Sequence, residues 1–205
     1  MKVETRVVGP IEENCYLVED AGELLVIDPG DELERIVSAV ARRPVRKIVL
    51  THGHWDHIGA AAGLSAKTGA RIAASKADAR SIETCERESV RKSPYGMPAV
   101  GEFLGDGDGV TVGFVSFRVI ATPGHTPGSI CLYSAAQKAL FSGDTLFAGG
   151  RYGRTDLAGG SFEAIVESMR GKLAAIPDDV NVYCGHGKPT TMGAERALNP
   201  YLARA

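Results

Sequence analysis

Residues 51–57 read Thr51-His52-Gly53-His54-Trp55-Asp56-His57, a run that holds three of the chain's five histidines. Histidine is the commonest metal ligand in proteins. Alternate residues of an extended segment point to the same side, so His52 and His54 can reach one ion together. A turn after the strand, eased by Gly53, can aim Asp56 and His57 at a second ion. The run therefore predicts two adjacent metal sites, an arrangement that two-metal hydrolases use.

Three further residues extend this candidate ligand set. His125 and His186 each lie next to glycine, and Asp144 follows the apolar stretch 139–141. A lone histidine is most often a surface or core residue, and Gly-Asp is a common turn pair. The concentration of all five histidines in these few segments argues against a surface or core role for them. Asp144 at a strand end can then be held by a cation rather than serve only as a turn residue. Five histidines with Asp56 and Asp144 supply three donors for each of two ions and one bridging carboxylate.

Composition excludes several classes of protein. The 205 residues, 44% of them hydrophobic, predict one domain with a sizeable core. The net charge is −2 and the 23 basic residues are dispersed, so we expect no nucleic-acid partner. No stretch has the roughly 18 apolar residues of a membrane helix, and no signal peptide is evident, so we expect a cytoplasmic protein. The widely spaced Cys15, Cys85, Cys131 and Cys184 predict reduced thiols rather than disulfides or a structural zinc site.

Apolar periodicity predicts alternating strands and helices. The expected strands are 2–8, 14–18, 23–27, 47–50, 110–121, 130–133, 139–141 and 180–183. A helix is expected after Asp31, which with Glu34 resembles a capping box, and alanine-rich 58–67 suggests another. Residues 161–175 repeat apolar side chains at helical spacing. Each candidate ligand comes just after a strand, so one edge of a sheet pair would collect them all.

Residues 76–109 are the least readable part of the chain. Residues 76–91 are polar and compatible with a helix, whereas 92–109 carry two prolines and five glycines. We expect a helix followed by a mobile loop. With Tyr95 this loop could be a lid over the site, or it could be an ordinary surface loop.

The ligand motif, followed by His125, Asp144 and His186, resembles the metallo-β-lactamase superfamily over essentially the whole chain. The resemblance implies a four-layer αβ/βα sandwich, with two mixed β-sheets flanked by helices, as a single domain over residues 1–205. It also implies one ion held by His52, His54 and His125, and a second ion held by Asp56, His57 and His186. Asp144 would then bridge the two.

Two further runs narrow the resemblance. Gly143-Asp144-Thr145-Leu146-Phe147 and Cys184-Gly185-His186-Gly187 are similar to the hydroxyacylglutathione hydrolase (glyoxalase II) branch. True β-lactamases tend to have cysteine where this chain has Asp144. Glyoxalase II continues into a helical extension that supplies basic residues for glutathione. Because the chain ends soon after His186, we expect that extension to be missing here.

A hydrolytic mechanism follows from the ligand set. Two divalent ions would lower the pKa of a shared water toward about 7, and the hydroxide, oriented by Asp56, would attack a carbonyl. No histidine is left as a general acid, so a leaving group that departs unprotonated is favoured. A thiolate fits, which indicates a thioester. Arg151, Tyr152 and Arg154 could clamp a substrate carboxylate or could belong to a solvated loop.

Other readings stay open. The run Gly153-Arg154-Thr155-Asp156 is similar to persulfide dioxygenases, in which the equivalents of His52, His125 and Asp144 hold a single iron. A lactonase or β-lactamase could use the same ions, and a non-catalytic metal-binding module is a further class. Zinc is the expected metal, although iron and manganese accept the same donors. The partner expected is a small-molecule substrate, and the sequence leaves its identity and the oligomeric state open.

Overall fold

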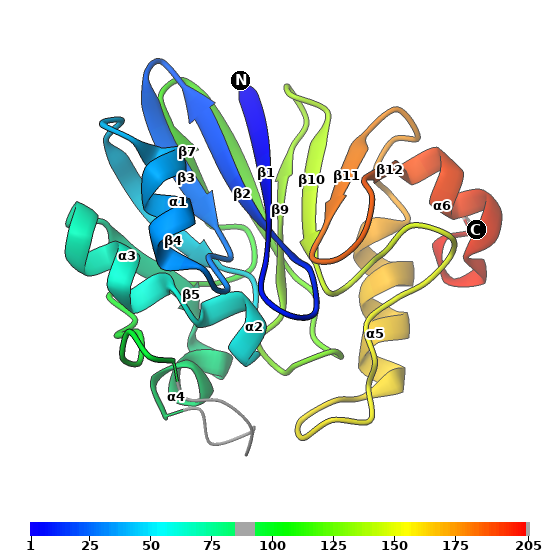
Figure 1. Cartoon of the computed structure of the whole chain (residues 1–205). Coiled ribbons are helices and arrows are strands. Elements are labelled where there is room, and N and C mark those ends of the chain that lie inside the picture. Colours follow the sequence, from blue (N-terminus) through cyan, green and yellow to red (C-terminus); the bar gives the residue numbers. More distant parts are fainter. Residues whose placement is uncertain (85–92, 204–205) are drawn as a thin grey trace.

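The computed structural model describes residues 1–84 and 93–203. Two six-stranded sheets stack face to face, and helices cover the outer face of each (Figure 1). This arrangement is the four-layer αβ/βα sandwich with two mixed sheets that the sequence predicts.

The first sheet contains the amino-terminal half of the chain, in sequence order. Its first three strands form an antiparallel meander, and the next three are added in parallel. The inner strands are apolar on both sides, as expected of a sheet with both faces covered. The strands are β1 (Lys2–Val8), β2 (Glu13–Asp20), β3 (Glu23–Ile27), β4 (Val45–Leu50), β5 (Arg71–Ser75) and β6 (Glu102–Leu104).

The second sheet has the order β12-β11-β10-β9-β8-β7. Only the β10–β11 pair is parallel, and its register shifts between Phe141 and Gly143. The strands are β7 (Gly109–Val112), β8 (Val115–Ala121), β9 (Ile130–Ser134), β10 (Ala139–Gly143), β11 (Asn181–Cys184) and β12 (Thr190–Thr191).

Helices form the two outer layers. The first sheet is covered by α1 (Leu33–Val40), α2 (Trp55–Ile58), α3 (Ala61–Thr68) and α4 (Lys76–Thr84). The second is covered by α5 (Phe162–Ser168), a π-helical turn (Met169–Leu173), α6 (Met192–Leu198) and a short 3-10 helix (Pro200–Leu202). Within the described residues, no helix has the length and apolar character needed to cross a membrane.

The central core lies between the two sheets. Leu25 and Val49 of the first sheet belong to the same buried cluster as Phe117 and Phe141 of the second. Tyr16 meets the edge of Phe141 with ring centroids 5.2 Å apart. Each such fully buried side chain stabilises the fold by roughly 1.5–3 kcal/mol. This core fixes the position of one sheet relative to the other. The loops that leave the strand ends of the two sheets are therefore also fixed relative to each other.

Several local predictions were wrong. The capping box does not form, because α1 begins after Glu32 at φ 51° without a side-chain cap. The expected strand 110–121 is a hairpin, β7 and β8, that turns at Gly113 and Phe114. The expected loop 92–109 contains strand β6 and the start of β7, and the helix 161–175 changes to a π-helical turn at Met169. Helix α4 confirms the start of the helix predicted over 76–91, whose later part, from residue 85 to 91, lies outside the described residues.

Candidate metal centre

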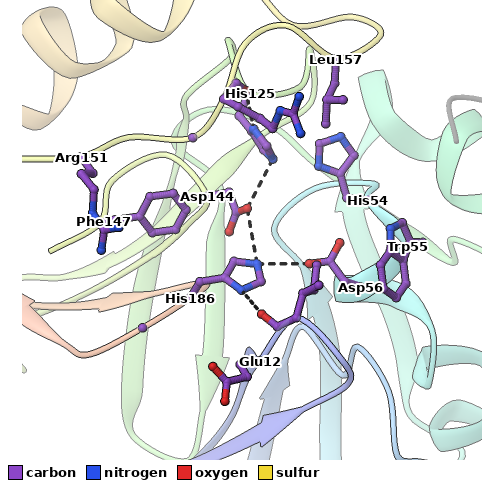
Figure 2. Close-up of a pocket in the computed structure, with 14 residues that line it drawn as sticks. Glu12, His54, Trp55, Asp56, His125, Asp144, Phe147, Arg151, Leu157 and His186 are labelled. Carbon is purple, nitrogen blue, oxygen red and sulfur yellow. Dashed lines mark hydrogen bonds and ion pairs between the residues drawn. The ribbon is translucent and has the colours of Figure 1, made fainter. Parts of the chain in front are cut away.

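The strand ends collect the candidate ligands, as the sequence predicts. The loop of His52 follows β4, His125 follows β8, Asp144 follows β10 and His186 follows β11. Side chains from these segments face one cavity of about 710 Å³. Figure 2 shows His125, Asp144, His186 and Asp56 in one chain of short contacts across it.

Two groups of donor atoms lie close enough to hold a metal ion each. The first is His52, His54 and His125, all buried. Three buried atoms at this place receive no hydrogen bond within residues 1–84 and 93–203: His52 Nε2, His125 Nε2 and Asp144 Oδ1. Unpartnered buried polar atoms are costly in a folded protein, and metal ions coordinated by these atoms would satisfy all three.

The second group is Asp56, His57 and His186. His57 Nε2 lies 3.3 Å from both His186 Nε2 and Asp56 Oδ2, and His186 Nε2 lies 3.1 Å from Asp56 Oδ2. Ligands about 2.0–2.1 Å from a tetrahedral zinc ion are roughly 3.3 Å apart. The three donors therefore already have the spacing of one face of a coordination tetrahedron.

The tautomers of His57 and His186 also indicate a metal site. His57 Nδ1 lies 3.0 Å from Asp28 Oδ2, and His186 Nδ1 lies 3.1 Å from the carbonyl of Ile11. Both partners only accept, so each Nδ1 carries the proton and, in the neutral ring, Nε2 carries a lone pair. Two lone pairs and a carboxylate then converge on one point. Such an arrangement is repulsive unless a proton or a metal ion lies at that point.

Asp144 connects the groups. Its Oδ1 lies 3.3 Å from His57 Nε2, and its Oδ2 lies 3.5 Å from His125 Nε2. One carboxylate thus reaches a histidine of each group, the geometry expected of a bridging ligand.

A third possible group, Asp28 with His52 and His57, shares both histidines with the others. Asp28 already accepts hydrogen bonds from the Thr51 backbone N at 2.7 Å and from Thr51 Oγ1 at 2.6 Å. We therefore assign Asp28 to the support of His57. Carboxylates commonly support metal-binding histidines in this way.

Electrostatics favours the ligating forms of His52, His54 and Asp56. Burial, and then the neighbouring His57, lower the pKa of His52 well below 6.5, and burial lowers that of His54 to about 4. Burial alone would raise the pKa of Asp56, but His57 and His186 hold it far below 3.8. Burial likewise opposes protonation of His57, yet Asp56 and Asp144 raise its pKa well above 6.5. The carboxylates around His57 therefore attract positive charge, which a bound metal ion also provides.

Main-chain contacts orient the remaining ligands. His125 Nδ1 donates to the carbonyl of Arg154 at 2.7 Å. The Asn14 amide donates to the carbonyls of Cys184 and Gly187, on either side of His186, at 3.0 and 2.9 Å. The start of β2 thereby holds the loop that carries His186.

Sequence reasoning missed Glu13, Asp28 and Asp78 as residues of this region. Glu13 is 1% exposed, neither of its oxygens has a hydrogen-bond partner within the described chain, and burial raises its pKa well above 4.5. Asp28 follows β3 as Asp144 follows β10, so the same rule of a carboxylate after an apolar strand would have found it. Asp78 lies in a polar helical segment, and no pattern in the sequence separates it from the other carboxylates there.

The three residues proposed to contact substrate lie in different surroundings. Arg151 lines the cavity with Phe147 on one side, opposite His54 and Trp55 (Figure 2). Arg154 also lines it, but its guanidinium pairs with Asp156 through two contacts of 2.7 Å. Tyr152 packs against Phe162 and Tyr201, away from the cavity lining.

Known proteins are similar to this chain in sequence and in fold. Residues 8–186 match the metallo-beta-lactamase superfamily. Hydroxyacylglutathione hydrolase GloC of Haemophilus influenzae is 35% identical over 212 residues, which cover 98% of both chains.

Three crystal structures are similar throughout. BLEG-1 B3 metallo-beta-lactamase has a TM-score of 0.90 at 32% identity, covering 99% of this chain and all of that one. TTHA1623 in a di-iron-bound form has a TM-score of 0.86 at 33% identity, covering 97% of this chain and all of that one. ETHE1 from Myxococcus xanthus has a TM-score of 0.81 at 28% identity, covering 99% of this chain and 85% of that one. With its sandwich and its His/Asp clusters, the chain belongs to the metallo-β-lactamase superfamily.

Proposed function

We propose that this protein is a dinuclear metal-dependent hydrolase that cleaves a thioester, such as an acyl-glutathione. The observation that carries the proposal is the pair of adjacent donor sets. His52, His54 and His125 form one set, while Asp56, His57 and His186 form the other at tetrahedral spacing. Asp144 reaches a histidine of each set.

Similar proteins support this reading. The Haemophilus influenzae protein that aligns over nearly the whole chain is named a hydroxyacylglutathione hydrolase. TTHA1623, which shares the fold over its full length, has been crystallised in a di-iron-bound form. Zinc is our first expectation for the ions here, since histidine and carboxylate ligands suit it, with iron or manganese as alternatives.

Two bound ions would supply an activated water and a Lewis acid for the substrate carbonyl. The chain's own part is to hold the metal-binding side chains in two adjacent groups. Asp56, with Oδ2 3.1 Å from His186 Nε2, has the position to orient the attacking water. Every histidine is a ligand candidate, so the leaving group departs without a proton from imidazole. A thiolate does so readily, because free thiols ionise near pH 8.5.

The cavity indicates a substrate with both apolar and anionic parts. Phe147, Leu157 and Trp55 give it apolar walls. Arg151 donates through Nε to the Ala148 carbonyl at 3.2 Å, and within residues 1–84 and 93–203 it forms no ion pair with a carboxylate. Its guanidinium is therefore available for a substrate carboxylate, which it can bind in bidentate fashion.

The first test is metal content followed by a substrate panel. Freshly purified protein should contain close to two metal ions per chain by elemental analysis. It should hydrolyse acyl thioesters faster than matched amides. Asp56→Ala and His54→Ala should each abolish thioester cleavage while circular dichroism reports an unchanged fold. Unchanged turnover in either variant would refute the proposal.

A second candidate is a persulfide dioxygenase with a single iron. Three of the five buried side-chain atoms without hydrogen bonds in the described chain belong to His52, His125 and Asp144, a set of two histidines and one carboxylate that suits non-haem iron. The likeness to ETHE1 supports keeping this candidate. One iron per chain, with oxygen consumption in the presence of a persulfide, would favour it over hydrolysis.

A lactonase or β-lactamase is a further alternative on the same ions. The fold similarity to BLEG-1 B3 metallo-beta-lactamase supports including it. Lactones and β-lactams therefore belong in the substrate panel, and a kcat/KM for either ring class above that for every thioester would reassign the activity.

A further inference from the structure

One buried carboxylate outside the ligand set connects the two segments that supply the three-histidine group. Asp78 of α4 is 0% exposed. Its Oδ2 accepts a hydrogen bond from the backbone N of Gly53 at 3.0 Å, and Gly53 lies between His52 and His54. The same oxygen accepts from Thr126 Oγ1 at 2.6 Å, and Thr126 follows His125.

The second oxygen completes the link. Asp78 Oδ1 accepts from the backbone N of Gly128 at 3.0 Å. A Cβ atom at Gly128 would lie 2.6 Å from the Asp78 carboxyl carbon, so the loop after His125 comes as close to the carboxylate as sterics permit. Both oxygens are thus engaged by the loops on which His52, His54 and His125 are carried.

We propose that Asp78 is a positioning residue for the three-histidine site, because its buried carboxylate ties the His52–His54 segment to the His125 loop and sets the distance between their imidazoles. Helix α4 lies at the same end of the sandwich as α2 (Figure 1). The inference rests on the metal centre of the proposed function but concerns metal binding, whatever the substrate.

The other donor set has separate supports. Asp28 holds His57, while Ile11 and Asn14 hold His186 and its loop. Asp78, by contrast, accepts its hydrogen bonds from Gly53, Thr126 and Gly128, which belong to the loops of His52, His54 and His125. Loss of the Asp78 carboxylate should therefore weaken one metal site and leave the other nearly unchanged.

Asp78→Asn is the sharpest variant. The amide keeps the shape but has one accepting oxygen, whereas three donors converge on Asp78 from Gly53, Thr126 and Gly128. In either orientation an NH₂ group faces at least one of these donors, so the loops must shift.

Glu195 provides a matched control. It is 1% exposed, and it too accepts from two glycine backbone N atoms, Gly149 at 3.1 Å and Gly150 at 2.6 Å, and from Thr190 Oγ1 at 2.7 Å. None of these donors adjoins a candidate ligand in the sequence. Glu195→Gln removes the same chemistry from a buried carboxylate without touching the His52–His54 segment or the His125 loop.

The experiment is a titration of the metal-free proteins with Zn²⁺ and with Co²⁺. Binding is monitored by calorimetry for both ions and by visible absorption for Co²⁺. Removal of outer partners of metal ligands typically lowers affinity 10- to 100-fold. We expect Asp78→Asn to raise the dissociation constant of one site at least about tenfold and to change its Co²⁺ band. The second site of that variant, and both sites of Glu195→Gln, should keep wild-type affinity.

Unchanged metal affinity in Asp78→Asn, with a loss of thermal stability equal to that of Glu195→Gln, would overturn the proposal and leave Asp78 a purely structural residue. If Asp78→Asn does not fold, the pair Thr126→Ala and Thr126→Ser decides. Alanine should weaken the same site, and serine, which keeps the hydroxyl, should restore it. Equal affinities in this pair would also reject the proposal.

These outcomes are distinct from those that test the proposed function. A wild-type protein that binds no metal would remove the metal centre itself. A wild-type protein that binds two ions but cleaves no thioester would remove the proposed reaction and leave the role of Asp78 intact.

Discussion

His57 donates through Nδ1 to Asp28 Oδ2 at 3.0 Å, and both side chains are buried. The contact directs His57 Nε2 toward Asp56, His186 and Asp144. Asp28 also accepts from the backbone and the hydroxyl of Thr51, the residue before His52. One carboxylate thereby supports the first residue of the ligand motif and its last histidine.

Asp28→Asn should weaken the site that contains His57. Asparagine tolerates the left-handed backbone at this position, where φ is 48°, so the variant should fold. It replaces an accepting oxygen with an NH₂ group or a weaker acceptor opposite His57 Nδ1. We expect metal affinity to fall about 10- to 100-fold at one site, measured by competition with a chromophoric chelator.

Asp20→Asn is the control, because Asp20 accepts a hydrogen bond from the Phe114 backbone N and neither residue lines the cavity. It should bind metal as the wild type does. Equal affinities in Asp28→Asn and Asp20→Asn would contradict the role given to Asp28.

Metal removal should destabilise the fold. Without ions, only protons on His57 and His186 are left to offset the carboxylates of Asp56 and Asp144 that face them. A free ion at 100 times its dissociation constant stabilises the folded state by about 2.7 kcal/mol per site. Chelation of both ions should therefore lower the Tm by roughly 10–20 °C, and added Zn²⁺ should restore it in a thermal scan.

The double variant His52→Ala with His57→Ala serves as the comparison, since each donor set has lost a histidine. Its Tm should not respond to chelator or to Zn²⁺. A wild-type Tm that is equally indifferent to both additions would count against a metal centre in this cavity.

The ligand segments were predictable because each follows a short apolar strand. Such a strand is a local pattern that the sequence alone reveals. His125 and His186 were found from glycine neighbours and from the small number of histidines, and the structure brings both to the cavity. The supports of these ligands were not predictable. Asp78 and Gly128 are 50 residues apart, and only the stacking of the two sheets brings them into contact.

The missed elements have similar explanations. Strand β6 has three residues, Glu102–Leu104, and its pairing with β5 rather than its own composition makes it a strand. The hairpin of β7 and β8 was read as one strand because apolar Phe114 occupies the turn, where it is 95% exposed. The expected capping box at Asp31 failed because the Asp31 carboxylate accepts from the Glu32 backbone N instead.

Gly30→Ala should disrupt the ligand motif through sterics. A Cβ at this position would lie 1.6 Å from the carbonyl oxygen of Asp56 and 2.7 Å from Glu13 Oε2. Backbone must move to relieve such overlap, which we expect to cost about 3 kcal/mol or more and to displace Asp56. Urea unfolding should report the loss, and the metal content should fall below that of the wild type.

Gly109→Ala is the matched substitution, because an added Cβ there would meet nothing within 4 Å. Its stability should stay within about 1 kcal/mol of wild type. If both alanine variants unfold at the same urea concentration, the close approach of Gly30 to Asp56 does not limit the site.

Arg151 and Arg154 should differ in their effect on substrate binding although both line the cavity. Arg154 is held by Asp156 through two contacts of 2.7 Å, whereas Arg151 forms no ion pair with a carboxylate within the described chain. A charge-assisted hydrogen bond is worth about 1.5–3 kcal/mol. Arg151→Ala should therefore raise KM roughly 10- to 100-fold for a thioester whose thiol part carries a free carboxylate. It should leave KM nearly unchanged for the corresponding methyl ester, and Arg154→Ala should raise KM much less for either compound.

An equal rise in KM for the acid and the ester would mean that Arg151 shapes the cavity but does not bind the carboxylate. A larger rise in KM from Arg154→Ala would assign carboxylate binding to Arg154.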